Sequence, residues 1–214
     1  LHRVGMVGQR ESQVIEQQLS RNEVQLIRGE ASFIDPHTLV VVSVEGHRTV
    51  TAANILIAVG TYPAAPQGVP ADGDTILTSD DLVRLRRLPK KLVVVGAGII
   101  GIEYASMFSA LQIEVIVVDK RDRILEFLDR ESVDELMHQM RSRRVTFRLG
   151  EAVERLEVTT GVPRQAVVFL ESGKGIVADQ VFFSVGRIGA TGRLNLEVVG
   201  VKPDDRGRLS VDQQ

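Results

Sequence analysis

The sequence predicts an α/β fold organised around a parallel sheet of the Rossmann-like, dinucleotide-binding type. Two short apolar runs rich in β-branched residues, 91–95 and 115–119, have the composition of buried parallel strands. Apolar residues at helical spacing lie between them. Alternating apolar and polar residues between 153 and 177 predict an antiparallel excursion from the sheet.

The turn between the first strand and the helix carries the motif G-x-G-x-x-G, at Gly96, Gly98 and Gly101. The first glycine permits a sharp turn, the second lets a pyrophosphate approach, and the third lets the helix pack closely on the strand. The first N–H groups of the helix then face the phosphates. Asp119 ends the second strand, where a carboxylate can accept the ribose hydroxyls of an adenosine. The strand, glycines, helix, second strand and acid, in this order, predict a dinucleotide-binding unit. The alternative is a βαβ unit that binds no nucleotide.

The residues that follow this acid carry the opposite charge. An acid at position 119 favours NAD, because it repels the 2′-phosphate of NADP. Lys120, Arg121 and Arg123 come next, and a cation here could pair with that phosphate or simply face solvent. The combination suits a site that accepts both NAD and NADP.

The composition of the sequence argues against several classes of function. A net charge of -2 argues against a nucleic-acid partner. The sequence contains no run of about 18 apolar residues, so no membrane span is predicted. The sequence has no cysteine, which excludes a disulfide scaffold and a thiol redox pair within it and fits a reducing, cytoplasmic setting. The four histidines are scattered, so no metal site is expected, and no residue is a convincing catalytic acid, base or nucleophile.

The segments before this unit predict an amphipathic helix followed by strands. Residues 1–22 have apolar side chains at helical spacing. Short strands are predicted at 24–27, 31–34, 38–44, 48–51 and 54–60, the last being a buried strand that ends at Gly60. Proline and glycine are dense over 61–90, which marks an inter-domain connection with a short helix beginning near 78.

The segments after the unit predict a return to the sheet. Residues 130–144 suit a second crossover helix, and 145–148 suit a strand. Residues 179–185 predict another apolar strand, which would end at Gly186.

Together these residues resemble the flavoprotein reductases with two dinucleotide-binding domains, the family of glutathione reductase and dihydrolipoamide dehydrogenase. The segment 57–63 is similar to the Ala-Thr-Gly strand end that closes the FAD domain, with Val59 in place of threonine. The segment 96–103 resembles the nicotinamide-domain fingerprint, and 185–187 resembles the second strand end.

Within this family the resemblance is closest to the soluble pyridine nucleotide transhydrogenases. The similar segments are 32–38, 119–129 and 186–191. The last segment departs from the pattern at Ala190, where asparagine is usual.

The resemblance implies a fragment of a longer protein. Residues 1–75 would be the later part of an FAD-binding domain, 76–190 an NAD(P)-binding domain, and 191–214 a return segment towards the FAD domain. The FAD fingerprint would precede this sequence, and a dimerisation domain would follow it, so the parent would be a homo-oligomer.

The resemblance also implies roles for single residues. Glu103 would contact the nicotinamide amide, while Ile99 and Ile100 would pack beneath the ring or simply in the core. Gly186 would let the backbone approach the nicotinamide, and Gly60 would do the same for FAD.

The implied activity is hydride transfer between NADPH and NAD⁺ through flavin, with little activity expected of this sequence alone. A fragment of a disulfide reductase is one alternative, and a cysteine pair upstream would distinguish it. A nucleotide-binding module without redox activity is the other.

Overall fold

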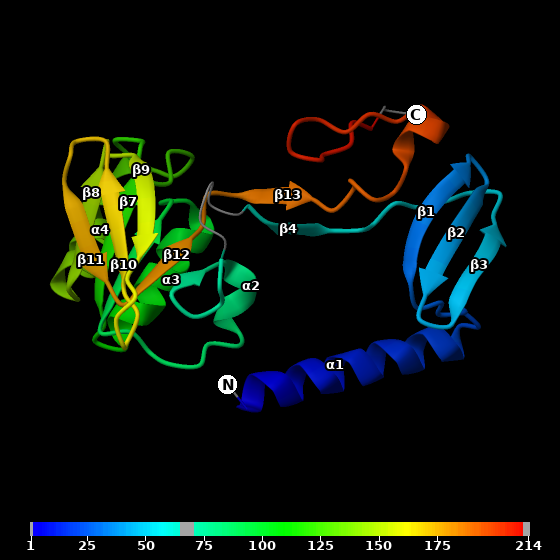
Figure 1. Cartoon of the computed structure of the whole chain (residues 1–214), viewed down its shortest axis with the longest axis horizontal. Helices are drawn as coiled ribbons and strands as arrows, with labels where there is room; N and C mark the ends of the chain where they lie inside the picture. Colours follow the sequence, from blue (N-terminus) through cyan, green and yellow to red (C-terminus); the bar gives the residue numbers. More distant parts are fainter. Residues whose placement is uncertain (1, 65–70, 212–214) are drawn as a thin grey trace. The chain divides into compact units, whose positions relative to one another are not determined.

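The computed structural model describes residues 2–64 and 71–211, and the chain divides into two compact units (Figure 1). One unit is the continuous stretch 63–186, and the other combines 1–62 with 187–214. These boundaries differ from the predicted 76 and 190, and strands β4 (Thr61–Pro63) and β13 (Arg187–Gly189) pair with each other there. Part of the predicted connection, residues 65–70, lies outside the described residues.

A five-stranded parallel sheet forms the centre of the unit 63–186. Its strand order is β5-β12-β6-β7-β8, and every neighbouring pair is parallel. The strands are β5 (Ile76–Leu77), β6 (Lys91–Val95), β7 (Glu114–Asp119), β8 (Val145–Leu149) and β12 (Gln180–Phe183). The predicted α/β class with a parallel sheet is confirmed.

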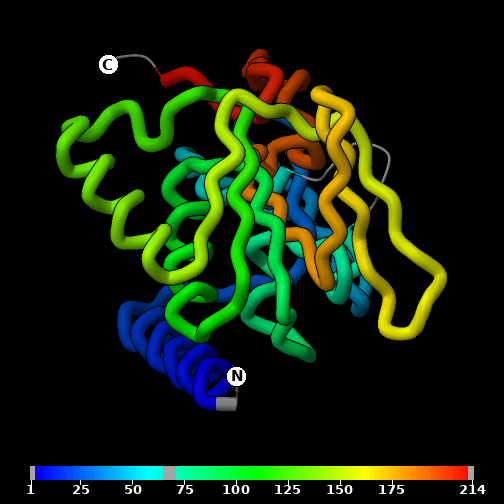
Figure 2. Tube along the Cα trace, turned by 90° about the vertical axis from the view of Figure 1, so that its left-hand side faces the viewer, coloured from blue at the N-terminus to red at the C-terminus, as the bar shows by residue number. Residues whose placement is uncertain are grey.

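Two different layers cover the two faces of this sheet. Side chains alternate along each strand, so Leu92 and Val94 of β6 face one core cluster while Val93 and Val95 face the other. The helices that pack against the first cluster are α2 (Ser79–Leu82), α3 (Ile99–Ala110) and α4 (Arg130–Ser142). The antiparallel strands that cover the second are β9 (Val153–Val158), β10 (Ala166–Leu170) and β11 (Gly175–Ala178). In Figure 2, α4 in light green and the β9–β10 hairpin in yellow lie on opposite sides of the sheet.

The order of the strands creates a switch point at the carboxyl ends of β6 and β12. From β6 the chain runs outwards through α3 to β7 and then through α4 to β8. It then passes through the antiparallel strands and returns on the other side of β6, as β12. The connection after β6 therefore leads to β7 on one side, whereas β12, the neighbour of β6 on the other side, leads out of the sheet, and ligands of open α/β sheets bind at such points.

The other unit contains a helix, a small antiparallel sheet and the C-terminal segment. Its elements are α1 (His2–Arg21), β1 (Glu30–Asp35), β2 (Thr38–Ser43), β3 (Gly46–Thr51) and the 3₁₀ helix η1 (Leu196–Val199). Phe33 of β1 packs with Leu194 and Leu196, and its N–H donates to the carbonyl of Leu194 at 2.8 Å. Residues distant in sequence thus share one small core.

Two strand predictions in this unit are wrong. Residues 24–27 and 54–60 form no strand, and most of them are exposed. Both stretches have strand-like composition, but a strand also needs a neighbour with which to form a ladder. Among the described residues neither stretch has one, and Ile55 and Ile57 only pack against the small core around Phe33.

Candidate functional site

The glycine turn leaves β6 with a backbone that other residues rarely adopt. Gly96 has φ of 103°, and its N–H donates to the carbonyl of Val118 at 2.8 Å, which ties the turn to β7. A Cβ at this position would lie 2.6 Å from the carbonyl oxygen of Ser184. The sharp turn therefore requires glycine for both its conformation and its space.

Gly101 and Ser184 close the turn against β12. A Cβ at Gly101 would lie 1.9 Å from the carbonyl oxygen of Gly96 and 2.5 Å from the hydroxyl of Ser184. That hydroxyl lies 3.0 and 2.8 Å from the carbonyl oxygens of Val95 and Gly96, which share its single proton. The third glycine thus permits close packing, and the serine fixes the turn at the switch point.

Gly98 differs from both, because its missing side chain faces open space. A Cβ there would meet no other atom within 4 Å, and its backbone is extended, with φ of -76°. Gly98 is the N-cap of α3 and offers no side chain to the first N–H groups of the helix. These N–H groups have no partner within the helix, and together with the helix dipole they favour an anion.

Asp119 lies at the end of β7 and reaches back to this turn. Its Oδ2 accepts a hydrogen bond from the N–H of Ala97 at 2.6 Å, and its side chain is only 5% exposed. Arg121 donates to both carboxylate oxygens, from Nε to Oδ1 at 3.0 Å and from Nη2 to Oδ2 at 2.7 Å. Burial would raise the pKa of Asp119, but the Arg121 guanidinium and the Ala97 N–H outweigh it and hold the pKa below the ordinary value of 3.8.

The other residues predicted for the site differ in their exposure to solvent. Ile99, in the first turn of α3, is 62% exposed, whereas Ile100 packs against the helix-side core. Glu103 and Lys120 are exposed, the first on α3 and the second directly after β7.

Gly186 and Gly60, which the sequence predicts to end strands, belong to different units. Gly186 follows β12 by a few residues and has φ of 124°, and its carbonyl accepts a hydrogen bond from Ala64. Gly60 has φ of 69°, and its carbonyl accepts a hydrogen bond from Ala190. Gly186 is in the same unit as the glycine turn, and Gly60 is in the other.

Two contributions to the site were not predicted from the sequence. One is Ser184, whose signal was a single hydroxyl at the end of the otherwise apolar run 181–185. The other is the bidentate contact of Arg121 with Asp119, which has no signal in the sequence because it depends on the conformation of a long side chain.

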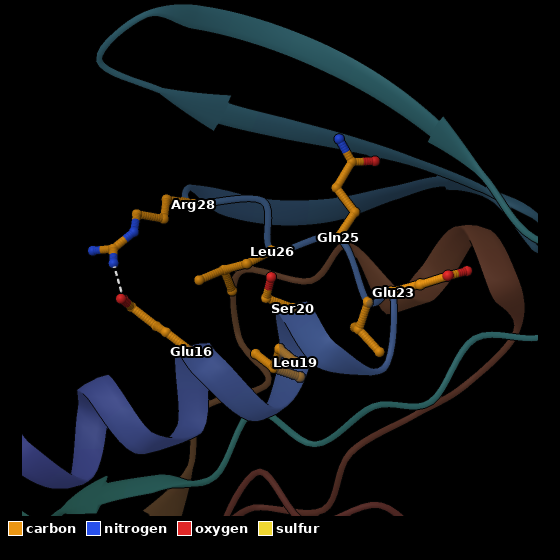
Figure 3. Close-up of a pocket in the computed structure, with 8 residues that line it drawn as sticks. Glu16, Leu19, Ser20, Glu23, Gln25, Leu26 and Arg28 are labelled. Atoms are coloured by element: carbon orange, nitrogen blue, oxygen red, sulfur yellow. Dashed lines mark hydrogen bonds and ion pairs between the residues drawn. The ribbon is translucent and has the colours of Figure 1, made fainter.

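A separate recess of about 400 Å³ lies in the other unit, between the end of α1 and the segment 23–28 (Figure 3). Arg28 and Glu16 form an ion pair beside it, and Leu19 and Leu26 supply apolar surface. The recess is open to solvent and contains none of the residues that the sequence predicted for a site.

Comparison with known proteins identifies the family of the chain. The family model described as pyridine nucleotide-disulphide oxidoreductase matches residues 5–214, which is nearly the whole chain. The chain belongs to this family. Among the helices in the described ranges, none is both long and apolar enough to cross a bilayer.

Several curated proteins share substantial identity with the chain. A soluble pyridine nucleotide transhydrogenase of Mycobacterium tuberculosis is 46% identical over 96% of this chain, and one of Photobacterium profundum is 40% identical over 90%. The chain spans only 44% and 41% of the lengths of these two proteins.

Solved structures also match the chain. LpdA from Mycobacterium tuberculosis has a TM-score of 0.89 with 27% identity, covering 99% of this chain and 47% of that one. The flavoprotein disulfide reductase RclA from Escherichia coli, as its Cu(II) complex, has a TM-score of 0.80 with 28% identity, covering 95% and 47%.

Proposed function

We propose that this chain is part of an FAD-dependent oxidoreductase that transfers hydride between NADPH and NAD⁺. The unit 63–186 would bind the nicotinamide nucleotide, and the other unit would be a later part of the FAD-binding domain. Family membership and relatives named soluble pyridine nucleotide transhydrogenase support this proposal. The observation that carries it is the open, uncapped N-terminus of α3 at Gly98, at the switch point of the sheet.

The chain's own residues would bind and orient the reactants. The first turn of α3 would hold the pyrophosphate, and the groups at Asp119 and Arg121 would meet the adenosine ribose. Ile99, Glu103 and Gly186 would lie against the nicotinamide, and Gly60 would lie against FAD. The flavin, when bound, supplies the hydride-accepting ring, so no acid or base is required of the protein.

A disulfide reductase is the second candidate, because the structures that resemble the chain include the flavoprotein disulfide reductase RclA. Such an activity needs a thiol pair, and these 214 residues contain no cysteine. The pair would have to lie elsewhere in a longer polypeptide. Redox-active cysteines there would favour the reductase, and their absence would favour the transhydrogenase.

Calorimetric titration of the chain with NADH and NADPH tests the nucleotide site. We expect weak binding and little hydride transfer, because only part of a flavin site is proposed to be present. Gly98→Ala should raise both dissociation constants at least about tenfold, because the new methyl group occupies the space proposed for the phosphates. The fold should be unaffected, since that methyl group meets no protein atom within 4 Å.

Gly192→Ala is the matched control, because its Cβ also meets nothing within 4 Å and it belongs to the other unit. Its nucleotide affinity should equal that of the unaltered chain. Failure of the unaltered chain to bind either nucleotide, or unchanged affinity in Gly98→Ala, would contradict the proposed site. Substantial flavin retention and turnover would contradict only the expected weak activity.

A further inference from the structure

The peptide group between Gly96 and Ala97 is held at both of its ends. Its N–H, which belongs to Ala97, donates to Oδ2 of Asp119 at 2.6 Å. Its carbonyl, which belongs to Gly96, lies 2.8 Å from the hydroxyl of Ser184. The N–H and the carbonyl of a trans peptide point in opposite directions. The residue that ends β7 and the residue that follows β12 therefore fix one peptide plane from two sides.

The carbonyl of Gly96 depends on the Ser184 hydroxyl more than the carbonyl of Val95 does. The Val95 carbonyl also accepts the backbone N–H of Ser184, at 2.8 Å. Gly96 is buried, and its carbonyl accepts no other hydrogen bond from the residues that the structure describes. A buried carbonyl without a donor is costly, so loss of the hydroxyl would affect the Gly96 end of the peptide first.

The glycine turn needs such a restraint from outside. Gly96 has φ of 103°, and glycine restricts its own backbone less than any other residue. The peptide 96–97 directly precedes Gly98, the N-cap of α3, so a rotation of this peptide would redirect the backbone that enters the helix. Gly101 leaves room for the restraint, since a Cβ there would lie 2.5 Å from the hydroxyl of Ser184.

We propose that Ser184 is a positioning residue of the nucleotide site, which orients the Gly96–Ala97 peptide and thereby directs the first turn of α3 towards the pyrophosphate. Ser184 acts through the turn and does not itself contact the nucleotide. This assignment rests on the proposed function and adds to it a residue on the strand beyond the βαβ unit. The alternative is that the hydroxyl only joins β12 to β6, and two measurements separate the two roles.

The first measurement compares two ligands in the same protein. ADP-ribose carries the pyrophosphate but no nicotinamide, and 5′-AMP carries a single phosphate. We would titrate both into the unaltered chain and into its variants, following amide chemical shifts by NMR, which reports weak binding. The readout is the ratio of the two dissociation constants within one variant. A fraction of unfolded protein lowers the signal but leaves this ratio unchanged.

Ser184→Ala should weaken ADP-ribose by about fivefold to thirtyfold and 5′-AMP by less than about threefold, because the loosened turn serves the pyrophosphate most. Ser184→Thr keeps the hydroxyl, so its ratio should stay within about twofold of that of the unaltered chain. Ser109→Ala is the matched control, because Ser109 is buried on α3 and its hydroxyl donates to the carbonyl of Ser106 at 2.8 Å. Its ratio should equal that of the unaltered chain.

The second measurement is amide hydrogen exchange at the turn. Loss of the hydroxyl frees the peptide 96–97, so exchange of the Ala97 N–H should quicken at least about tenfold in Ser184→Ala. The N–H groups of Gly96 and of residue 184 donate to the carbonyls of Val118 and Val95, and the substitution leaves both bonds in place. Their exchange should therefore change by less than about threefold.

Equal acceleration at these three amides would show that the hydroxyl only joins the two strands, and would overturn the assignment. An unchanged ratio in Ser184→Ala, or an effect of Ser184→Thr as large as that of Ser184→Ala, would overturn it as well. In each of these cases the proposed nucleotide site would stand. Failure of the unaltered chain to bind ADP-ribose, NADH or NADPH would overturn the proposed function and this assignment together.

Discussion

A buried carboxylate makes the stability of its surroundings depend on pH. Asp119 is charged and enclosed, and its pKa lies below 3.8 because Arg121 and the Ala97 N–H stabilise the ionised form. A carboxyl whose pKa is lower in the folded state stabilises the fold fully above its unfolded-state pKa. That contribution is lost as the pH falls through the folded-state pKa.

Asp119→Asn should therefore lower the free energy of unfolding by about 1–3 kcal/mol near pH 7, because it removes the buried carboxylate of an ion pair whose guanidinium is partly exposed. The difference from the unaltered chain should be constant above about pH 5 and shrink as the pH falls towards 3. Hydrogen exchange of the β6 and β7 amides would measure it. Asp122→Asn, at an exposed position, is the control and should change this free energy by less than about 0.5 kcal/mol.

A difference for Asp119→Asn that stays constant down to pH 3 would show that the ionised carboxylate is not the source of the stabilisation. Packing of the new side chain would then explain the loss instead.

Among the elements, α4 depends on one side chain at its start. Asp129 is the N-cap, and its Oδ1 accepts hydrogen bonds from the N–H groups of Glu131 and Ser132 at 3.0 and 3.3 Å. The buried face of α4, with Val133 and Met137, covers the parallel sheet. Fraying at its first turn would therefore loosen the helix-side core.

Asp129→Ala should destabilise the unit by about 0.5–2 kcal/mol, because two N–H groups lose their acceptor. Asp129→Asn keeps an acceptor oxygen and should cost only a few tenths of a kcal/mol. Exchange rates of the α4 and β8 amides would measure both effects. Equal protection in Asp129→Ala and the unaltered chain would mean that tertiary packing alone holds the first turn.

The elements that the sequence predicted well are those whose own residues show how they are buried. The strands at 91–95 and 179–185 were recognisable because both faces of a central parallel strand are buried, which demands a continuous apolar run. The run 54–60 has the same composition, yet no ladder partner is present among the described residues. Composition records what a strand can bury, but pairing depends on distant parts of the chain.

The same distinction applies to the candidate site. The order of strand, glycines, helix and acid placed Gly96, Gly98, Gly101 and Asp119 around one turn, because βαβ topology fixes their positions. It did not predict which donors occupy the carboxylate. Several cations follow Asp119, and only the folded chain shows that the side chain of Arg121 turns back onto it.

At the scale of the whole molecule, the two units differ in how much apolar surface they bury. Nearly all buried apolar side chains among the described residues belong to the unit 63–186, in clusters on both faces of its sheet. Those of the other unit are Phe33, Val41, Leu194 and Leu196. A small core supplies little stability against the entropy of ordering the chain.

The unit 63–186 should therefore fold by itself and keep the proposed nucleotide site, since the glycine turn, Ser184, Asp119 and Arg121 all lie within it. A polypeptide of these residues should show a cooperative thermal transition and bind NADPH within about threefold of the affinity of the whole chain. Circular dichroism and calorimetry would measure the two properties. Gly98→Ala in the same polypeptide should remove binding without changing the transition. A folded polypeptide with no affinity for NADPH, beside a whole chain that binds it, would mean that residues of the other unit complete the site.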